Sequence, residues 1–156
     1  MGVEVRVLSR AQMKKTLLKQ AKKYAFELLG YDGRVPLYVL SKDNCSEVSR
    51  LVGDWLLKKL PRAKIYIAKG KIKNHFHDLV LVQEDKVVYA LDPTVWQFFK
   101  NKKSIFIAEG NSINDILDTL ASYYGGTWRV SENIKKYSAT EIQKLKDVII
   151  KNKTLH

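Results

Sequence analysis

The chain has 156 residues, with 28 Lys and Arg against 16 Asp and Glu, so its formal net charge is +12. Its 46% hydrophobic and 10% aromatic content suits a globular core, and we expect one domain over residues 1–156. Periodic apolar spacing argues against intrinsic disorder, and no apolar run is long enough for a transmembrane helix. The first residues lack the order of a signal peptide, so a cytoplasmic protein is expected, with a secreted effector left open. The single cysteine excludes an internal disulfide framework and fits a reducing compartment.

Lysine supplies most of the positive charge. Nucleic-acid readers usually rely on arginine for bidentate contacts to bases and phosphates. We interpret the charge mainly as a solvated surface, with a binding patch for nucleic acid or an acidic protein as the alternative. The lysines fall on expected polar helix faces (Lys15, Lys19, Lys22, Lys23) or in expected turns (Lys69, Lys71, Lys73, Lys100, Lys102, Lys103).

The first part of the chain alternates weakly and then changes to helical spacing. Apolar residues recur at about 3.6-residue spacing up to Leu29, where Gly30 and Gly33 end the pattern. We expect, in chain order, a short strand over 3–8, a helix capped by Ser9, an extended segment over 35–40, a turn at 41–44, and a helix from Cys45 that stops before Pro61.

The middle of the chain has the period-2 alternation of strands. The polar residues 83–85 fit the loop of an antiparallel hairpin. The expected strands are 63–68, 76–82, 86–91 and 104–108, followed by a helix from Ser112 to 125–126 and a last helix with a capping box at Ser138 and Glu141. Helices, then antiparallel strands, then helices predict an α+β fold.

Cys45 stands at the start of the second expected helix. Asn44 is a favoured N-cap residue, and Glu47 follows it at the spacing of a capping box. The first helical turn offers unpaired N–H groups and the positive end of the helix dipole, so it favours a thiolate and a developing oxyanion. Cys45 is therefore a candidate nucleophile, and the alternative is a small buried side chain.

Two histidines open the strand expected at 76–82. Period-2 geometry puts His75 and His77 on one face. The start of one hairpin strand lies beside the end of the next, so His77 is expected close to Asp92. A carboxylate there would orient the ring and support its imidazolium form, as in a nucleophile–base–orienter triad. The alternative for either histidine is a half-buried polar residue.

These residues resemble the papain-like and transglutaminase-like cysteine enzymes, in which a helix-borne cysteine precedes a strand histidine and then a strand aspartate or asparagine. Residues 92–98, Asp-Pro-Thr-Val-Trp-Gln-Phe, are also similar to the corresponding segment of small papain-fold proteins. The resemblance covers about residues 38–99. It implies a papain-like core, with the nucleophile helix packed on a small antiparallel sheet and flanked by helices.

The resemblance also implies roles and an activity. Cys45 would be the nucleophile, His77 the general base and acid, and Asp92 the orienter. The activity would be hydrolysis of an amide bond through a thioester, as in a peptidase, isopeptidase or glutamine deamidase, with no metal or cofactor. The substrate would be a protein or peptide, for which the basic surface suggests acidic character. The backbone N–H of Cys45 would be one oxyanion donor, Asn44 a candidate for the second, His75 a rival base, Gln97 a candidate cleft residue, and Trp96 a cleft or core residue.

Other interpretations stay open. Transglutaminase-like acyl transfer shares the thioester chemistry, but the short chain leaves little room for an acceptor domain. A metal site from Cys45, His75, His77 and Asp92 is a second alternative, although one cysteine without a Cys-x-x-Cys pattern disfavours structural zinc. A non-catalytic basic module, which binds nucleic acid or an acidic protein, is a third, and it lacks a recognisable nucleic-acid-reading motif. A papain-fold protein that only binds is the fourth.

Overall fold

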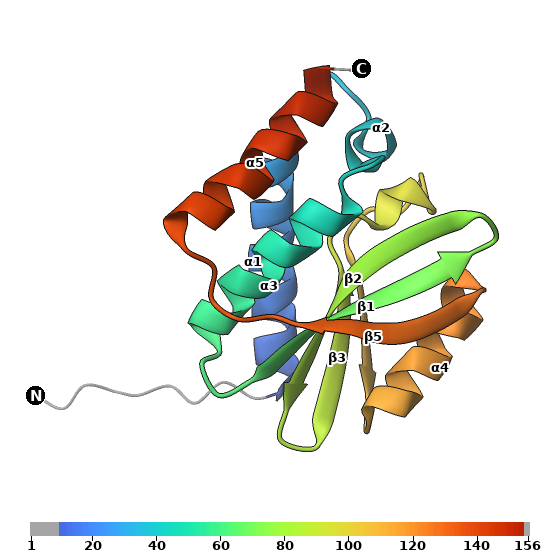
Figure 1. Ribbon diagram of the computed structural model, residues 1–156. Coiled ribbons are helices and arrows are strands. Elements are labelled where there is room, and N and C mark those ends of the chain that lie inside the picture. The colour runs from blue at the N-terminus through green and yellow to red at the C-terminus, as the bar shows by residue number, and fades with distance from the viewer. Residues whose placement is uncertain (1–9, 155–156) are drawn as a thin grey trace, which may run out of the picture.

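Residues 10–154 are described by a computed structural model, in which helices cover an antiparallel sheet (Figure 1). The strand expected at 3–8 and the cap Ser9 lie outside the described residues. The elements are α1 (Arg10–Leu29), α2 (Leu37–Ser41), α3 (Cys45–Lys59), β1 (Lys64–Ile72), β2 (His75–Glu84), β3 (Val87–Asp92), the 3-10 turn η1 (Val95–Gln97), β4 (Phe106–Gly110), α4 (Ile113–Tyr124), β5 (Thr127–Asn133) and α5 (Ala139–Thr154). Among them, no helix is both long and apolar enough to cross a membrane.

The sheet has five strands in the order β4-β3-β2-β1-β5, and every neighbouring pair is antiparallel. The α+β class is confirmed. The turns of its two hairpins hold Lys73 and Asp85 at positive φ, 55° and 54°. The hairpin expected around residues 83–85 is therefore present, and it brings β3 beside β2.

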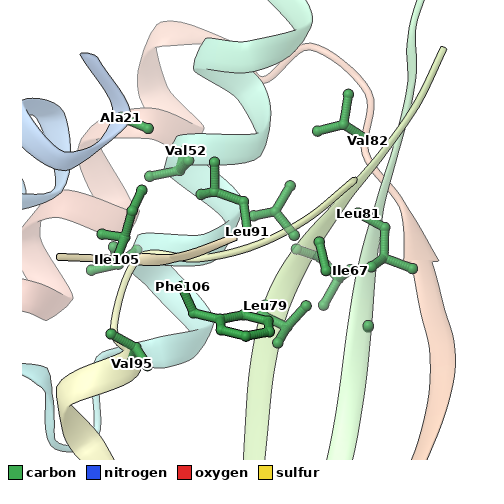
Figure 2. Close-up of a cluster of buried hydrophobic side chains, with 14 of the residues drawn as sticks. Ala21, Val52, Ile67, Leu79, Leu81, Val82, Leu91, Val95, Ile105 and Phe106 are labelled. Atoms are coloured by element: carbon green, nitrogen blue, oxygen red, sulfur yellow. The ribbon is translucent and has the colours of Figure 1, made fainter. Parts of the chain in front are cut away.

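Helices lie on both faces of the sheet. α3 packs on β1 and β2, and α1 and α5 pack on α3 (Figure 1). Strand alternation assigns Ile65 and Val82 to the α3 side and Leu79 and Asp92 to the side of α4, whose Tyr124 bonds Asp92. Both sides of the central strands are therefore buried, which gives β2 its continuous apolar run. Figure 2 shows part of this core, with side chains from α1, α3, β1, β2, β3 and the chain around β4.

The extended segment expected at 35–40 is wrong, because Leu37–Ser41 form the short helix α2. Pro36 fixes φ at −59°, and its carbonyl accepts from the N–H groups of Val39 and Leu40 at 3.1 and 3.2 Å. Leu40 and Ser41 are buried in this turn. The helical turn is favoured because it buries Leu40 and Ser41 against the rest of the protein. A short apolar run in the sequence does not reveal such burial.

β1 is longer than expected and places Lys69 and Lys71 in a strand rather than in a turn. The strand continues because β2 pairs with it on one side and β5 on the other. β5 itself was not predicted: it is a mostly exposed edge strand, so it lacks the apolar alternation that marks a half-buried strand.

The expected helix starts at Ser112 and Ser138 are confirmed. Ser112 Oγ accepts from the N–H of Asp115 at 3.1 Å. Ser138 and Glu141 make both bonds of a capping box, 3.2 Å from Glu141 N–H to the hydroxyl and 3.1 Å from Ser138 N–H to the carboxylate. Local sequence is enough to specify these ends because every bond lies within three residues.

Candidate active site

Cys45 is the first residue of α3 and is half-buried. The first bond within the helix runs from Val48 N–H to Asn44 O, at 3.0 Å. The N–H groups of Cys45, Ser46 and Glu47 therefore have no acceptor inside the helix. These donors surround the thiol at the positive end of the helix dipole.

Asn44 occupies the N-cap position, but its side chain does not cap the helix, so the expected capping box is wrong. Its Nδ2 donates to Leu40 O at 2.7 Å, and its Oδ1 accepts from Asn152 Nδ2 of α5 at 2.9 Å. These two partners, of which Asn152 is 108 residues away, together with burial of Asn44 to 2% exposure, outcompete the local capping bond. The amide ties α2 and α5 to the start of α3, and the N–H groups there keep no side-chain cap.

His77 and Asp92 meet where β3 ends. The last paired residues of β2 and β3 are Val80 and Leu91, so His77 lies just beyond the part of β2 that pairs with β3. Its Nε2 lies 2.6 Å from Oδ2 of Asp92, and both side chains are fully buried. The proximity expected from the hairpin is confirmed.

The Asp92 carboxylate is held on both oxygens. Oδ1 accepts from the N–H of Thr94 at 3.0 Å, within the Asp-Pro-Thr turn. Oδ2 accepts from the hydroxyl of Tyr124, at the end of α4, as well as facing His77. The buried carboxylate thus has three partners that hold it in place.

The charge state of His77 follows from these neighbours. Burial has the largest single effect and lowers the pKa of His77, but the charge and hydrogen bond of Asp92, aided by a hydrogen bond and charge from Cys45, raise that pKa to about 10. The imidazolium is therefore the main form at neutral pH. Nε2 is committed to Asp92, so Nδ1 is the nitrogen available to the thiol; it is buried and has no other hydrogen-bond partner among the described residues.

Three aromatic rings enclose His77, and none of them was predicted from the sequence as a site residue. Phe98 packs edge-on at 4.8 Å between ring centroids, Tyr124 at 5.6 Å, and Trp128 edge-on at 6.3 Å. They exclude water from the imidazole. Tyr124 does follow Leu120 at helical spacing, which marks it as a core residue, but its bond to Asp92 depends on how α4 docks on the sheet.

Polar contacts beside His77 fix the start of α3. Ser49 Oγ donates to the Asp78 carbonyl at 3.0 Å. Arg50 donates to Asp78 Oδ2 at 3.0 Å and to Glu132 Oε2 of β5 at 2.8 Å. These bonds tie α3 to β2 and β5 within five residues of the thiol, and so set where Cys45 lies relative to the ring.

The other expected site residues lie elsewhere. His75 is exposed at the start of β2. Trp96 is fully buried, donates from Nε1 to Lys102 O at 2.7 Å and packs on Phe26, so it belongs to the core and the cleft interpretation of it is wrong. Gln97 is half-buried beside Phe98, and its Oε1 is buried with no hydrogen-bond partner among the described residues.

The described residues contain no group of three or more His, Cys, Asp or Glu side chains suited to hold a metal ion. The alternative metal site built on Cys45, His75, His77 and Asp92 therefore gains no support. Comparisons with protein-family models, with curated proteins and with solved structures give no match for this chain. Function is consequently argued from the site itself.

Proposed function

We propose that the protein is a cysteine-dependent hydrolase of amide bonds with a papain-like core. One observation carries the proposal: a half-buried thiol at a helix start interacts with a histidine whose Nε2 is held 2.6 Å from a buried aspartate. The base thus lies between the nucleophile and the orienter, which is the order that nucleophilic catalysis requires. The uncapped N–H groups of α3 add donors for an oxyanion.

In the proposed first step, the Cys45 thiolate attacks the carbonyl carbon of the substrate. The new S–C bond produces a tetrahedral oxyanion, which the N–H groups at the start of α3 stabilise. His77 passes the proton from Nδ1 to the leaving nitrogen as the C–N bond breaks, and a thioester on Cys45 is left. Asp92 keeps Nε2 in place throughout.

In the second step, water adds to the thioester. His77 accepts a proton from the attacking water through Nδ1, the C–S bond breaks, and the product leaves as a carboxylic acid. The thiolate–imidazolium pair is thereby restored. An amine in place of water would give acyl transfer by the same route, so the acceptor is part of the test.

Acylation by p-nitrophenyl acetate tests the chemistry without knowledge of the natural substrate. We expect a burst of about one equivalent of p-nitrophenolate, followed by slow turnover, because the thioester accumulates. Cys45→Ser abolishes the burst, and His77→Ala slows it by about 100-fold or more. Butylamine added as a competing acceptor reports the balance between hydrolysis and acyl transfer.

Alkylation provides a second measurement that needs no acyl group. Iodoacetamide at pH 6 should modify Cys45 at least about tenfold faster than it modifies glutathione, because a neighbouring imidazolium favours the thiolate. The matched control for His77→Ala is His75→Ala, at an exposed position of the same strand. This control should leave the rate of alkylation of Cys45 unchanged. A Cys45 that reacts no faster than glutathione and gives no burst would contradict the proposal.

A further inference from the structure

A shallow pocket of about 190 Å³ lies on the sheet strands that flank His77. It is formed where the start of β2, the end of β1 and the start of β5 meet. Its lining combines cations with aromatic rings: Lys69, Lys71, Phe76, Thr127, Trp128 and Arg129.

The register of the sheet places this pocket beside the start of α3. Lys69 lies opposite Asp78 of β2 and opposite Arg129 of β5, so the three share one face. Arg50 of α3 bonds Asp78, which makes this the face on which α3 begins. The pocket is therefore on the same side of the sheet as the helix that carries the thiol.

Trp128 belongs both to the lining of the pocket and to the surroundings of His77. It lines the pocket, and its ring also packs edge-on to the imidazole at 6.3 Å. Gly70 lies opposite both residues in the sheet, and a Cβ there would come within 2.5 Å of the indole. The glycine thus lets the indole lie across β1 against the imidazole, on the face of the sheet opposite to Lys69 and Arg129.

The pocket carries unpaired positive charge. Lys71 and Arg129 are exposed, and neither has a carboxylate partner within the described residues. Lys69 Nζ is 3.7 Å from the Asp78 carboxylate, which bonds Arg50 at the shorter distance of 3.0 Å. The charge of Lys69 is therefore only partly neutralised. Phe76 is 59% exposed, and Lys69 and Lys71 hold their ammonium groups about 6 Å from its ring centroid.

We propose that this pocket binds an acidic side chain, Asp or Glu, of a peptide substrate whose scissile bond lies at Cys45. The proposal rests on the proposed function and gives it a substrate class. The cations supply the charge complement for a carboxylate, and the exposed ring covers its apolar stem.

The same face argues for a polypeptide rather than a nucleic acid. Arg50 holds Asp78 and Glu132 there, next to the pocket, and two carboxylates would repel a continuous run of phosphates. The Phe76 ring already has two ammonium groups near it, which compete with base stacking. A single carboxylate side chain of a peptide fits so small a pocket better than a run of phosphates does.

Binding of labelled peptides to the Cys45→Ser protein tests the inference. The probes are a fluorescein-labelled octapeptide rich in Glu, the same peptide with Gln for Glu, and a labelled oligodeoxythymidylate of equal length. The test variant is Lys71→Glu/Arg129→Glu. The control, Lys144→Glu/Lys151→Glu, makes the same charge change at exposed positions of α5, on the far side of α3 from the sheet.

We expect saturable binding of the Glu peptide, with about tenfold weaker affinity in the test variant and little change in the control. Three results would each overturn the inference. The Glu peptide could bind the test and control variants with equal affinity, the Gln peptide could bind as tightly as the Glu peptide, or the oligonucleotide could bind more tightly than the Glu peptide in a way that depends on the pocket. Circular dichroism checks folding, and Lys71→Gln/Arg129→Gln replaces the charge reversal if that variant unfolds.

The two proposals fail in different ways. Binding is measured without the thiol, so loss of peptide binding overturns the pocket and leaves the acylation result untouched. Conversely, absence of an acylation burst with intact, pocket-dependent peptide binding overturns the hydrolase proposal alone.

Discussion

The hydroxyl of Tyr124 donates to Oδ2 of Asp92, the same carboxylate oxygen that faces Nε2 of His77. The two residues are 32 positions apart in the chain, and both are buried. Burial, then the charge and hydrogen bond of Asp92, raise the pKa of Tyr124, so the phenol stays protonated and acts only as a donor to the carboxylate. Tyr124 is thus a positioning residue for the orienter of the candidate triad.

Tyr124→Phe removes this donor and leaves the rest of the ring in place. We expect a loss of about 1–3 kcal/mol in the free energy of unfolding, because a buried carboxylate loses a partner. We also expect His77 to titrate at higher pH, since Asp92 becomes a stronger acceptor. Chemical denaturation and an NMR titration of the imidazole in Cys45→Ser protein measure the two effects.

The matched control is Tyr123→Phe, on the neighbouring and more exposed tyrosine, and it should change stability by less than about 0.5 kcal/mol. Lower stability of Tyr124→Phe with no shift in the His77 titration would reduce Tyr124 to a packing role.

The raised pKa of His77 makes stability depend on pH. This pKa is about 10 in the folded protein, above the ordinary histidine value of 6.5, so the stabilisation it brings is fully present below about pH 6.5 and is lost as pH rises towards 10. In this window only the folded state holds the proton. The contribution should fall by about 1.4 kcal/mol per pH unit.

Comparison of Cys45→Ser with Cys45→Ser/His77→Gln isolates this contribution and keeps thiol titration out. The stability difference between them, from urea unfolding at several pH values, should narrow from about pH 6.5 upwards. Cys45 helps to raise the pKa of His77, so this pKa should lie below 10 in the two Cys45→Ser proteins. The stability difference should therefore stop narrowing below pH 10. A pH-independent difference would mean that the ring is neutral in the folded protein.

Gly70→Ala tests the passage of Trp128 across β1. A Cβ at this position would lie 2.5 Å from the indole, so the ring must move away from its place against His77. We expect a loss of about 1–3 kcal/mol in stability, as for other overpacked sites. The loss should be smaller in a Trp128→Ala background, and a double-mutant cycle measures that coupling. Additive effects would show that the indole does not restrict residue 70.

Asn44→Ala separates a structural from an oxyanion role. The Asn44 amide joins α2 to α5, and its loss should cost about 1–3 kcal/mol in the free energy of unfolding. The acylation burst should be retained, since the backbone donors of α3 remain. Asn152→Ala, which removes one partner only, should cost less. A lost burst with unchanged stability would instead favour Asn44 as the second oxyanion donor.

The sequence was most informative where interactions are local. The bonds at Ser112 and Ser138 form within three residues, and the hairpin at 83–85 fixes β3 beside β2. Pairing in that hairpin is enough to predict that His77 meets Asp92. The same local rules failed for Asn44 and for residues 35–40, where buried contacts with distant segments override the local preference.

Charge illustrates the same limit. The net charge of +12 does not decide the role of the lysines, because the sequence alone does not show which cations gather on one face. β5 supplies the missing information: it brings Arg129 opposite Lys69 and lays Trp128 across Gly70.

By itself, then, the sequence determined the α+β class, most helices and strands, and the proximity of His77 to Asp92. Only the tertiary structure decided how α3 sets Cys45 against the ring, how α4 brings Tyr124 to the carboxylate, and where β5 adds a basic pocket. The physical reason is range. Propensity, capping and hairpin register act between near neighbours, whereas these contacts join distant segments through side-chain packing on the sheet.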